Sequence, residues 1–395
     1  MVDIVIVAGE TSGDQLAANL VQRVRALRPD INFHGIAGPA MRAAGVSTWI
    51  DSETLAVRGY AEVLSALPRI FRAKRELIAK TQALKPALFI GVDAPDFNLR
   101  VERELKAQGV RTMHYVCPSF WAWRPERAAK FKDSADHVLC LFPFEPKLLA
   151  GHAVAATFVG HPLASVPLRT ADRGRLRRKL EHRGEAPDAP LIAVLPGSRV
   201  SEIELHSDLF IDVMARLAER FPKCHFVVPL VTRATRDQFE VALWRRAEAL
   251  VPRVRLLFGH ADFALRSADV ALVASGTATL EAAMLGCPQV VSYRVTGLTA
   301  AIVMRKLNSQ FVSLPNIIAG DWCVPELLQA AATPEAVTSA LASLIAQSRL
   351  RAQMQAAYAT LGDALRAPKN AGHDALALAV LSQLRHEPGD QLRHG

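Results

Sequence analysis

Two carboxylates follow an apolar run in the segment GVDAPDFN at residues 91–98, where Asp93 and Asp96 lie three residues apart around Pro95. A carboxylate at the end of a buried strand faces a ligand crevice, and burial there raises its pKa toward the range that suits a general base. The pattern predicts Asp93 as a catalytic base and Asp96 as a cap of the next helix. Either residue can instead be a plain turn or cap residue.

The segment LPGSR at residues 195–199 is suited to an anion. Gly197 and Ser198 follow an apolar run, so we expect their backbone amides and the serine hydroxyl to be free for a ligand. The guanidinium group of Arg199 is a fork of donors that matches phosphate oxygens. The alternative is a surface arginine beside a tight turn.

The segment ASGTATLE at residues 274–281 predicts a diphosphate site. Ser275, Gly276 and Thr277 lie where a helix begins, and backbone N–H groups at helix N-termini bind phosphates. Glu281 follows about one helical turn later, where its carboxylate can reach ribose hydroxyls. The same residues also fit ordinary helix initiation.

The segment GETSGD at residues 9–14 directly follows the first apolar run. Gly9 permits a tight turn, and after Glu10 the hydroxyls of Thr11 and Ser12 can cap the next helix or hold a polar group. No lysine follows the glycine, so the segment is neither a P-loop nor a dinucleotide fingerprint. A capped turn between a strand and a helix is the alternative.

A stretch at residues 55–75 mixes apolar and basic side chains. An apolar face flanked by bases can lie on an anionic membrane surface. The predicted membrane contacts are Leu64, Leu67, Phe71, Arg69 and Arg72. An ordinary packed helix with a solvated basic side is the alternative.

Metal and disulfide chemistry are not predicted. The five cysteines are scattered without a Cys-x-x-Cys pair, and the histidines are dispersed. An Asp-x-Asp pair that would hold Mg²⁺ is also missing near these segments. We therefore expect neither a metal nor a cofactor, and we expect Arg199 and helix amides to stabilise a leaving diphosphate.

The elements that position these segments alternate between short apolar runs and amphipathic stretches, which is typical of βαβ units. The predicted strands are Asp3–Val7, Phe33–Ala37, Leu88–Val92, Thr112–Val116, His137–Phe142, Leu191–Leu195, His225–Pro229, Val254–Phe258, Ala271–Ala274, Gln289–Tyr293 and Phe311–Leu314. The predicted fold class is α/β, with two Rossmann-like domains whose parallel sheets face a central cleft. Ligands gather at the carboxyl ends of such strands.

The predicted domains follow one another along the chain. The first covers residues 1–168, the second covers 188–335, and C-terminal helices occupy 336–384. The Arg-rich stretch between Pro167 and Pro190 is expected to contain one polar helix at the domain junction.

Composition limits the class of protein. The chain has 395 residues, of which 50% are hydrophobic and 22% charged, as in a globular chain of two domains. It lacks a long uncharged apolar run and a basic signal-peptide region, so the sequence predicts a soluble, cytoplasmic protein. The net charge of +9 favours an anionic partner, but nothing resembles a nucleic-acid-binding motif.

Taken together, these segments resemble the lipid-A-disaccharide synthase family of bacterial glycosyltransferases, over nearly the whole chain. The resemblance rests on VAGETSGD at 7–14, GIAGPAM at 35–41, GVDAPDFN at 91–98, HYVCPSFWAWR at 114–124, LPGSR at 195–199, ASGTATLEA at 274–282 and VSLPNIIAG at 312–320. So many segments in the same order make it far more specific than any single glycine loop.

The resemblance implies a GT-B fold and an inverting, metal-independent reaction. UDP-2,3-diacylglucosamine and 2,3-diacylglucosamine 1-phosphate would give a β-1,6 disaccharide and UDP. It implies Asp93 as the base, donor contacts at Arg199 and at residues 275–281, and an acceptor side with the GETSGD loop, the segment 118–124 and Asn316.

The resemblance also implies that the C-terminal helices cross back onto the first domain. Because both substrates are acylated, it implies a peripheral position at the cytoplasmic face of the inner membrane, and it is compatible with a homodimer. Another GT-B transferase or a UDP-sugar epimerase would share the fold but not the acceptor. A non-catalytic nucleotide-sugar or lipid-binding protein would not need Asp93 and Arg199.

Overall fold

The computed structural model describes residues 2–55, 60–120, 128–165, 173–180, 189–295, 310–368 and 374–384, with the side chains of 60–65, 129 and 130 left out. The chain divides into two compact units. The first comprises Met1–His161 and Leu365–Gly395, and the second comprises Pro162–Ala364.

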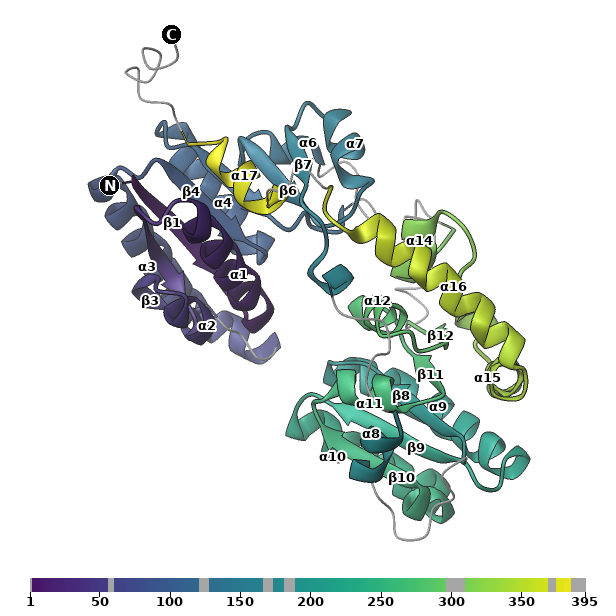
Figure 1. The fold of residues 1–395 in the computed structure, drawn as a ribbon. Helices are drawn as coiled ribbons and strands as arrows, with labels where there is room; N and C mark the ends of the chain where they lie inside the picture. Colours follow the sequence, from purple (N-terminus) through teal and green to yellow (C-terminus); the bar gives the residue numbers. More distant parts are fainter. Residues whose placement is uncertain are drawn as a thin grey trace. The chain divides into compact units, whose positions relative to one another are not determined.

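The first unit is built on a seven-stranded sheet with the order β3-β2-β1-β4-β5-β6-β7, and all its strand pairs are parallel (Figure 1). The strands are β1 (Val2–Ala8), β2 (Ile31–Ala37), β3 (Ser47–Asp51), β4 (Leu88–Val92), β5 (Thr112–Tyr115), β6 (His137–Cys140) and β7 (Ala156–Phe158). Every residue of β4 is buried, as expected for a parallel sheet with both faces covered.

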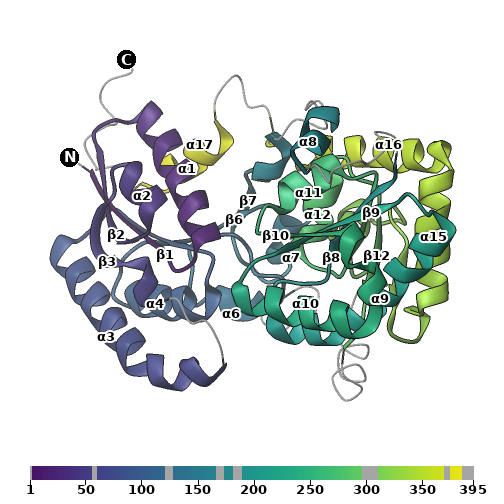
Figure 2. The same cartoon turned by 90° about the horizontal axis from the view of Figure 1, so that it is seen from below.

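Helices cover both faces of this sheet. One face packs against α1 (Thr11–Leu27), α2 (Pro39–Ala43) and α17 (Ala375–Leu381), and the other against α3 (Tyr60–Leu84) and α4 (Pro95–Ala107). The unit also contains η1 (Ser52–Thr54), α6 (Ala128–Phe131) and α7 (Glu145–Ala150). Figure 2 shows α17, close to the end of the chain, beside α1, so segments from both ends of the chain share one core.

The second unit is built on a six-stranded parallel sheet with the order β10-β9-β8-β11-β12-β13. The strands are β8 (Leu191–Leu195), β9 (His225–Leu230), β10 (Val254–Phe258), β11 (Val270–Val273), β12 (Gln289–Tyr293) and β13 (Glu326–Leu328).

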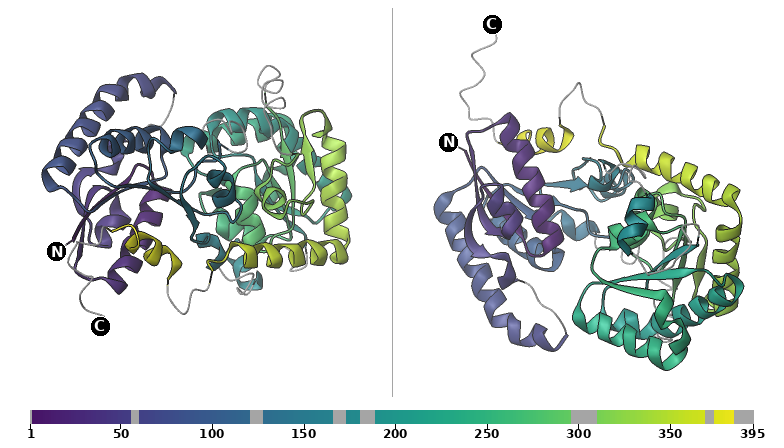
Figure 3. Two further views of the ribbon diagram at one scale, coloured as in Figure 1. Left: turned by 90° about the horizontal axis from the view of Figure 1, so that it is seen from above. Right: turned by 60° about the horizontal axis from the view of Figure 1, so that its bottom comes forward.

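In this unit, α8 (Arg173–Leu180), α11 (Ala261–Ser267) and α12 (Thr277–Met284) pack on one face of the sheet. The helices α9 (Val200–Arg220), α10 (Arg233–Ala247) and α15 (Pro334–Ala346) pack together against the strands from the other side. The remaining helices are η3 (Pro162–Ser165), η4 (Glu248–Arg253), α14 (Leu314–Ala319), η5 (Gln329–Ala331) and α16 (Ser348–Leu365). Figure 3 shows the long helix α16 running along this unit.

The predicted α/β class with two parallel sheets is confirmed, with one wrong strand. Residues 311–314 do not form a strand, because Ser313 is the N-cap of α14 and the helix begins at Leu314. Pro315 lacks an N–H group, which disfavours a strand and suits the first turn of a helix. The strands β3, β7 and β13 were not predicted, since they are short and mostly half-exposed, with no continuous apolar run.

Both sheets reverse their strand order at one place. The order reverses between β1 and β4 in the first sheet and between β8 and β11 in the second. At such switch points the connections leave the sheet in opposite directions, so a crevice opens beyond the carboxyl ends of the two strands. Ligand sites in doubly wound folds lie there.

Candidate functional site

The four segments that the sequence singled out all lie at these switch points. GETSGD follows β1 and GVDAPDFN includes and follows the end of β4, whereas LPGSR ends β8 and ASGTATLE follows β11. The sequence predicted strand-end positions, and the strand order now shows that each pair of segments belongs to neighbouring strands.

The turn after β4 has an unusual backbone. Asp93 has a φ of 51° and Ala94 a φ of 43°, so two consecutive residues with side chains are left-handed. Each such residue costs about 1–2 kcal/mol, and strain of this kind persists only where its surroundings enforce it. The backbone amide of Asp93 donates to the carbonyl oxygen of Tyr115 at 2.9 Å, and the side chain of Asp93 is half-buried.

The GETSGD segment lies against this turn. A Cβ atom added at Gly13 would lie 3.7 Å from the Cβ of Asp93, and one added at Gly9 would lie 3.4 Å from the Cβ of Ala94. The first two predicted segments therefore meet at one edge of the first sheet.

Within GETSGD, the expected capping by Thr11 and Ser12 is wrong. The helix α1 begins at Thr11 with Glu10 as its N-cap, so both hydroxyls are inside the first turn, and Glu10, Thr11 and Ser12 are exposed. The residue with a structural role is the buried Asp14, whose carboxylate accepts from the amides of Gly38, Ala40 and Met41. Asp14 thus joins GETSGD to the GIAGPAM segment.

Asp96 is not the N-cap that the sequence predicted. The N-cap of α4 is Ala94, and the exposed Asp96 lies in the first turn of the helix, because Pro95 already occupies the first helical position. A carboxylate in that turn is favoured by the helix dipole.

In the second unit, the LPGSR amides are not free, which corrects the sequence-based expectation. The Oε2 atom of Glu202 accepts from the backbone amides of Ser198 at 2.8 Å and of Arg199 at 3.2 Å. Gly197 has a φ of 136°, and a Cβ there would lie 2.5 Å from the Cβ of Glu202. The carboxylate therefore occupies the place expected for an anion, while the exposed side chain of Arg199 stands at the N-cap of α9.

The segment after β11 begins the helix α12 with Gly276 as its N-cap, at a φ of 79°. Gly276 and Thr277 are exposed, whereas Ser275 and Glu281 are half-buried. Burial raises the pKa of the Glu281 carboxyl, and the negative charge of Asp262 adds to this effect. The end of β11 thus brings together the N-terminus of α12, the hydroxyls of Ser275 and Thr277, and the carboxylate of Glu281.

Tyr293 lies near both of these segments, although the sequence analysis does not single it out. It ends β12, which neighbours β11, and its side chain is half-buried. Burial and the charge of Glu202 raise the pKa of Tyr293, while the nearby Ser275 side chain and the positive charge of Arg199 oppose this shift. The sequence signal for Tyr293 is its position at the carboxyl end of the predicted strand 289–293.

His206 links the carboxyl ends of β8 and β12. This fully buried residue places Nδ1 at 3.0 Å from the carbonyl oxygen of Pro196, and its Nε2 accepts from the amide of Arg294 at 3.1 Å. The ring lies 4.8 Å from the ring of Tyr293 between centroids. Accepting at Nε2 requires the neutral imidazole, and burial lowers the pKa of His206.

Asn316 lies in the second unit, fully buried, with its amide group saturated. Its Oδ1 accepts from the amides of Cys323 and Val324, and its Nδ2 donates to the Val324 carbonyl and to Glu326. Glu326 in turn accepts from the backbone amide and hydroxyl of Ser313. Asn316 therefore holds the VSLPN loop in place.

Two other regions bear on the sequence-based predictions. On α3, Leu67 is 37% exposed and Phe71 is 51% exposed, and Arg69 and Arg72 are exposed beside them. The side chain of Leu64 and residues 121–124 of the aromatic segment lie outside the described part of the chain.

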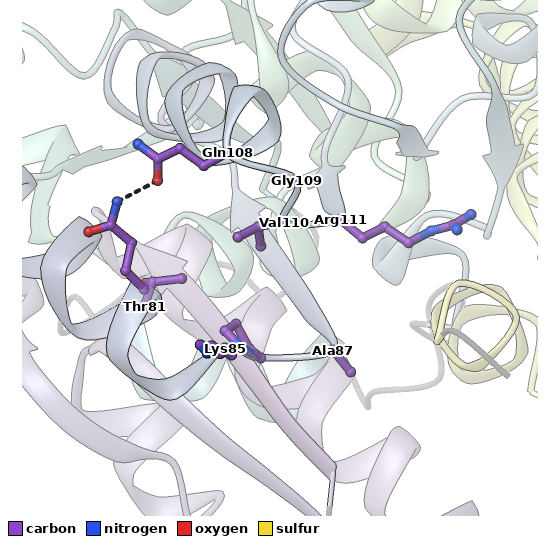
Figure 4. Close-up of a pocket in the computed structure, with 9 residues that line it drawn as sticks. Thr81, Lys85, Ala87, Gln108, Gly109, Val110 and Arg111 are labelled. Carbon is purple, nitrogen blue, oxygen red and sulfur yellow. Dashed lines mark hydrogen bonds between the residues drawn. The ribbon is translucent and has the colours of Figure 1, made fainter. Parts of the chain in front are cut away.

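A pocket at the amino ends of β4 and β5 lies at the opposite edge of the first sheet from Asp93 (Figure 4). Its lining comprises Thr81, Gln82, Lys85, Pro86, Ala87, Gln108, Gly109, Val110 and Arg111. These residues include none of those predicted for the site.

Among the described residues, neither a metal-binding cluster nor a membrane-spanning helix is found. Within those ranges, His, Cys, Asp and Glu side chains do not gather in groups of three or more that could hold a metal ion. In the same part of the chain, no helix has the length and apolar character needed to span a membrane.

Comparison with solved structures identifies the fold. The UDP-GlcNAc 2-epimerase of Neisseria meningitidis superposes with a TM-score of 0.64 at 11% identity, covering 97% of this chain and 99% of that one. The sucrose-phosphate synthase of Thermosynechococcus elongatus superposes with a TM-score of 0.58 at 13% identity, covering 97% and 98%. At such identities the likeness concerns the fold alone, and the predicted GT-B fold is confirmed.

Sequence comparison is more specific. A family model described as lipid-A-disaccharide synthetase matches residues 4–380. The lipid-A-disaccharide synthase of Chromobacterium violaceum is 47% identical over 364 residues, which cover 92% of this chain and 93% of that protein. The match thus spans both units and all four segments, and the chain belongs to the lipid-A-disaccharide synthase family.

Proposed function

We propose that this chain transfers the diacylglucosamine of UDP-2,3-diacylglucosamine to 2,3-diacylglucosamine 1-phosphate, with release of UDP. The observation that supports this proposal is the family match over residues 4–380, because the family is named for formation of the lipid A disaccharide. The residue roles below rest on the geometry of the two sheet edges.

Asp93 is the base of this proposal. It removes the proton from the 6-hydroxyl of the acceptor, whose oxygen attacks the anomeric carbon from the side opposite UDP. A single displacement inverts the configuration and needs one base. The observation that supports Asp93 is its place on a held, left-handed turn at the switch point of the first sheet.

The donor contacts lie in the second unit. The guanidinium of Arg199 and the first-turn amides of α12, from Gly276 and Thr277, stabilise the charge on the departing diphosphate. Because Glu202 already occupies the amides of Ser198 and Arg199, the arginine side chain carries this role within LPGSR. Glu281 accepts from ribose hydroxyls.

Residues of the first unit and of the VSLPN loop complete the proposal. The exposed Glu10, Thr11 and Ser12, beside Gly9, lie near Asp93 and are suited to acceptor hydroxyls. Asn316 acts indirectly, since its amide group is used within its own loop.

Turnover with the two acylated substrates tests the proposed function. The expected product is a disaccharide whose mass equals that of the two substrates together minus that of UDP, detected by mass spectrometry. UDP release should depend on the acceptor, which distinguishes the transferase from an epimerase or a transferase with another acceptor. Release of UDP without the disaccharide would overturn the proposal.

We also propose that α3 rests on the anionic cytoplasmic face of the inner membrane, where acylated substrates reside. Leu67 and Phe71 lie one helical turn apart and are exposed, while Ala66, Ala73 and Leu77 are buried. Exposed apolar side chains beside arginines bind both the acyl region and anionic head groups.

Replacing Leu67 and Phe71 by Ser should reduce sedimentation with vesicles that contain anionic phospholipid by about tenfold, because two apolar side chains leave the membrane. The matched control is Val241→Ser with Phe258→Ser, which removes two residues that are 66% and 59% exposed in the second unit. Equal losses in both variants would contradict the assignment to α3.

A further inference from the structure

A buried polar cluster lies directly beneath the turn that carries Asp93. Asn98 and Glu102 are one turn apart on the same face of α4, and His114 is on β5; all three are fully buried. The Nδ1 atom of His114 lies 2.7 Å from Oε1 of Glu102. Polar side chains are rarely placed in such a position without a structural or functional reason.

Asn98 contacts the strained turn itself. Its Nδ2 donates to the carbonyl oxygen of Asp93 at 2.8 Å and of Val92 at 3.2 Å. Its own backbone amide donates to the carbonyl oxygen of Ala94 at 3.0 Å. Asn98 therefore binds three consecutive carbonyl groups, those of Val92, Asp93 and Ala94.

Gly91 allows this arrangement. A Cβ at this position would lie 2.1 Å from Oε1 of Glu102 and 2.9 Å from the Cβ of Asn98. The strand can approach α4 so closely only because residue 91 has no side chain. The glycine that opens GVDAPDFN and the asparagine that ends it are thus parts of one contact.

The Glu102–His114 pair fixes α4 against β5 next to this contact. His114 pairs with Gly91 across the sheet, so the imidazole and the glycine lie side by side. Oε2 of Glu102, Nε2 of His114 and Oδ1 of Asn98 have no hydrogen-bond partner among the described residues. Such unsatisfied buried atoms are costly, so each calls for a structural or functional reason.

From these contacts we infer that Asn98 is a positioning residue for Asp93: its amide group holds the left-handed turn at Asp93 and Ala94, and so aims the carboxylate. This inference rests on the proposed role of Asp93 as the base. Asn98 does not touch the substrate. Its effect is on the fraction of molecules in which the base is correctly placed.

The test compares Asn98→Ala with Thr112→Val. Thr112 is also fully buried, and its hydroxyl donates to the carbonyl of Ser134 at 2.9 Å, but it lies at the amino end of β5. Both changes remove a buried hydrogen bond to the backbone. A misplaced base lowers kcat by up to about 10²-fold, so we expect that loss for Asn98→Ala only, with UDP affinity within about twofold of the unmodified protein.

Rescue separates positioning from a general loss of stability. Ala94→Gly removes the cost of the left-handed conformation, so adding it to Asn98→Ala should recover about tenfold in kcat. Asn98→Ser keeps one donor and should lie between Asn98→Ala and the unmodified chain. Normal kcat in Asn98→Ala, an equal loss in Thr112→Val, or no recovery with Ala94→Gly would overturn the inference.

Asp93→Ala, measured in parallel, separates this inference from the proposed function. Normal turnover in Asp93→Ala would remove the base assignment. An inactive Asp93→Ala variant together with a fully active Asn98→Ala variant would remove only the positioning role.

Discussion

Each unit has a fully buried histidine near its candidate residues, but the two histidines have different partners. His114 of the first unit contacts the carboxylate of Glu102, whereas His206 of the second unit bridges two backbone groups, the carbonyl of Pro196 and the amide of Arg294. The first unit thus has a buried acid–imidazole pair next to the contact between Asn98 and the Asp93 turn. The second supports a set of strand ends through a neutral ring.

This difference gives the two regions opposite responses to pH. Burial raises the pKa of Glu102 above its ordinary 4.5, so the folded state keeps a proton that the unfolded chain releases, and stability falls as the pH rises above 4.5. Burial lowers the pKa of His206 below its ordinary 6.5, so the unfolded chain binds a proton first, and stability falls as the pH drops below 6.5.

The largest expected effect separates the roles of the two units. Asp93→Ala should lower turnover by about 10²-fold or more, because the acceptor hydroxyl loses its base. UDP affinity, measured by calorimetry, should remain nearly unchanged. Normal turnover would show that Asp93 is not the base.

Arg199→Ala is the reciprocal control for that experiment. A charge-assisted hydrogen bond contributes about 1.5–3 kcal/mol, so UDP affinity should fall by at least about tenfold and turnover should fall with it. If UDP affinity were instead lost in Asp93→Ala and retained in Arg199→Ala, the UDP contact would belong to the first unit and not to the second.

A smaller effect is expected at His206. His206→Leu leaves the carbonyl of Pro196 and the amide of Arg294 unpaired, at about 1–3 kcal/mol for each buried group, so UDP affinity should fall by about tenfold. His206→Gln retains a donor and an acceptor and serves as the matched control. In the unmodified protein, stability should decline below pH 6.5, and both variants should lack that component.

The smallest effect is expected for Glu102→Gln. The amide keeps a partner for His114 but does not titrate, so between pH 4.5 and 7 the melting temperature of the unmodified protein should fall relative to the variant. A difference of about 1 kcal/mol corresponds to about 2–4 °C for a folding unit of about 150–250 residues, the size class of the first unit. A constant gap in melting temperature across that range would contradict a raised pKa.

Much of the fold could be predicted from local patterns. The runs Leu191–Leu195 and Gln289–Tyr293 became strands with those bounds, because continuous apolar runs between turn signals suit strands buried on both faces. The run at 311–314 failed because capping by Ser313 and the ring of Pro315 favour a helix over a strand. Hydrophobicity alone does not distinguish these cases.

The candidate site could be predicted only as separate segments. Glycines, hydroxyls and a carboxylate after strands indicated Asp93, Arg199 and Ser275, because strand ends face ligands whatever the strand order is. The closure of the LPGSR amides by Glu202 could not be predicted, since a carboxylate three residues into a helix can either cap it or face solvent.

The sequence by itself determined the α/β class, the family and the residue types that carry the proposed chemistry, because these depend on composition, spacing and order along the chain. The tertiary structure alone decided which strands are neighbours, and so which segments meet. It also brings the Asn98 amide group to the carbonyl oxygen of Asp93, and His206 to the ends of β8 and β12. Such contacts depend on burial and backbone geometry between distant residues, which local patterns do not encode.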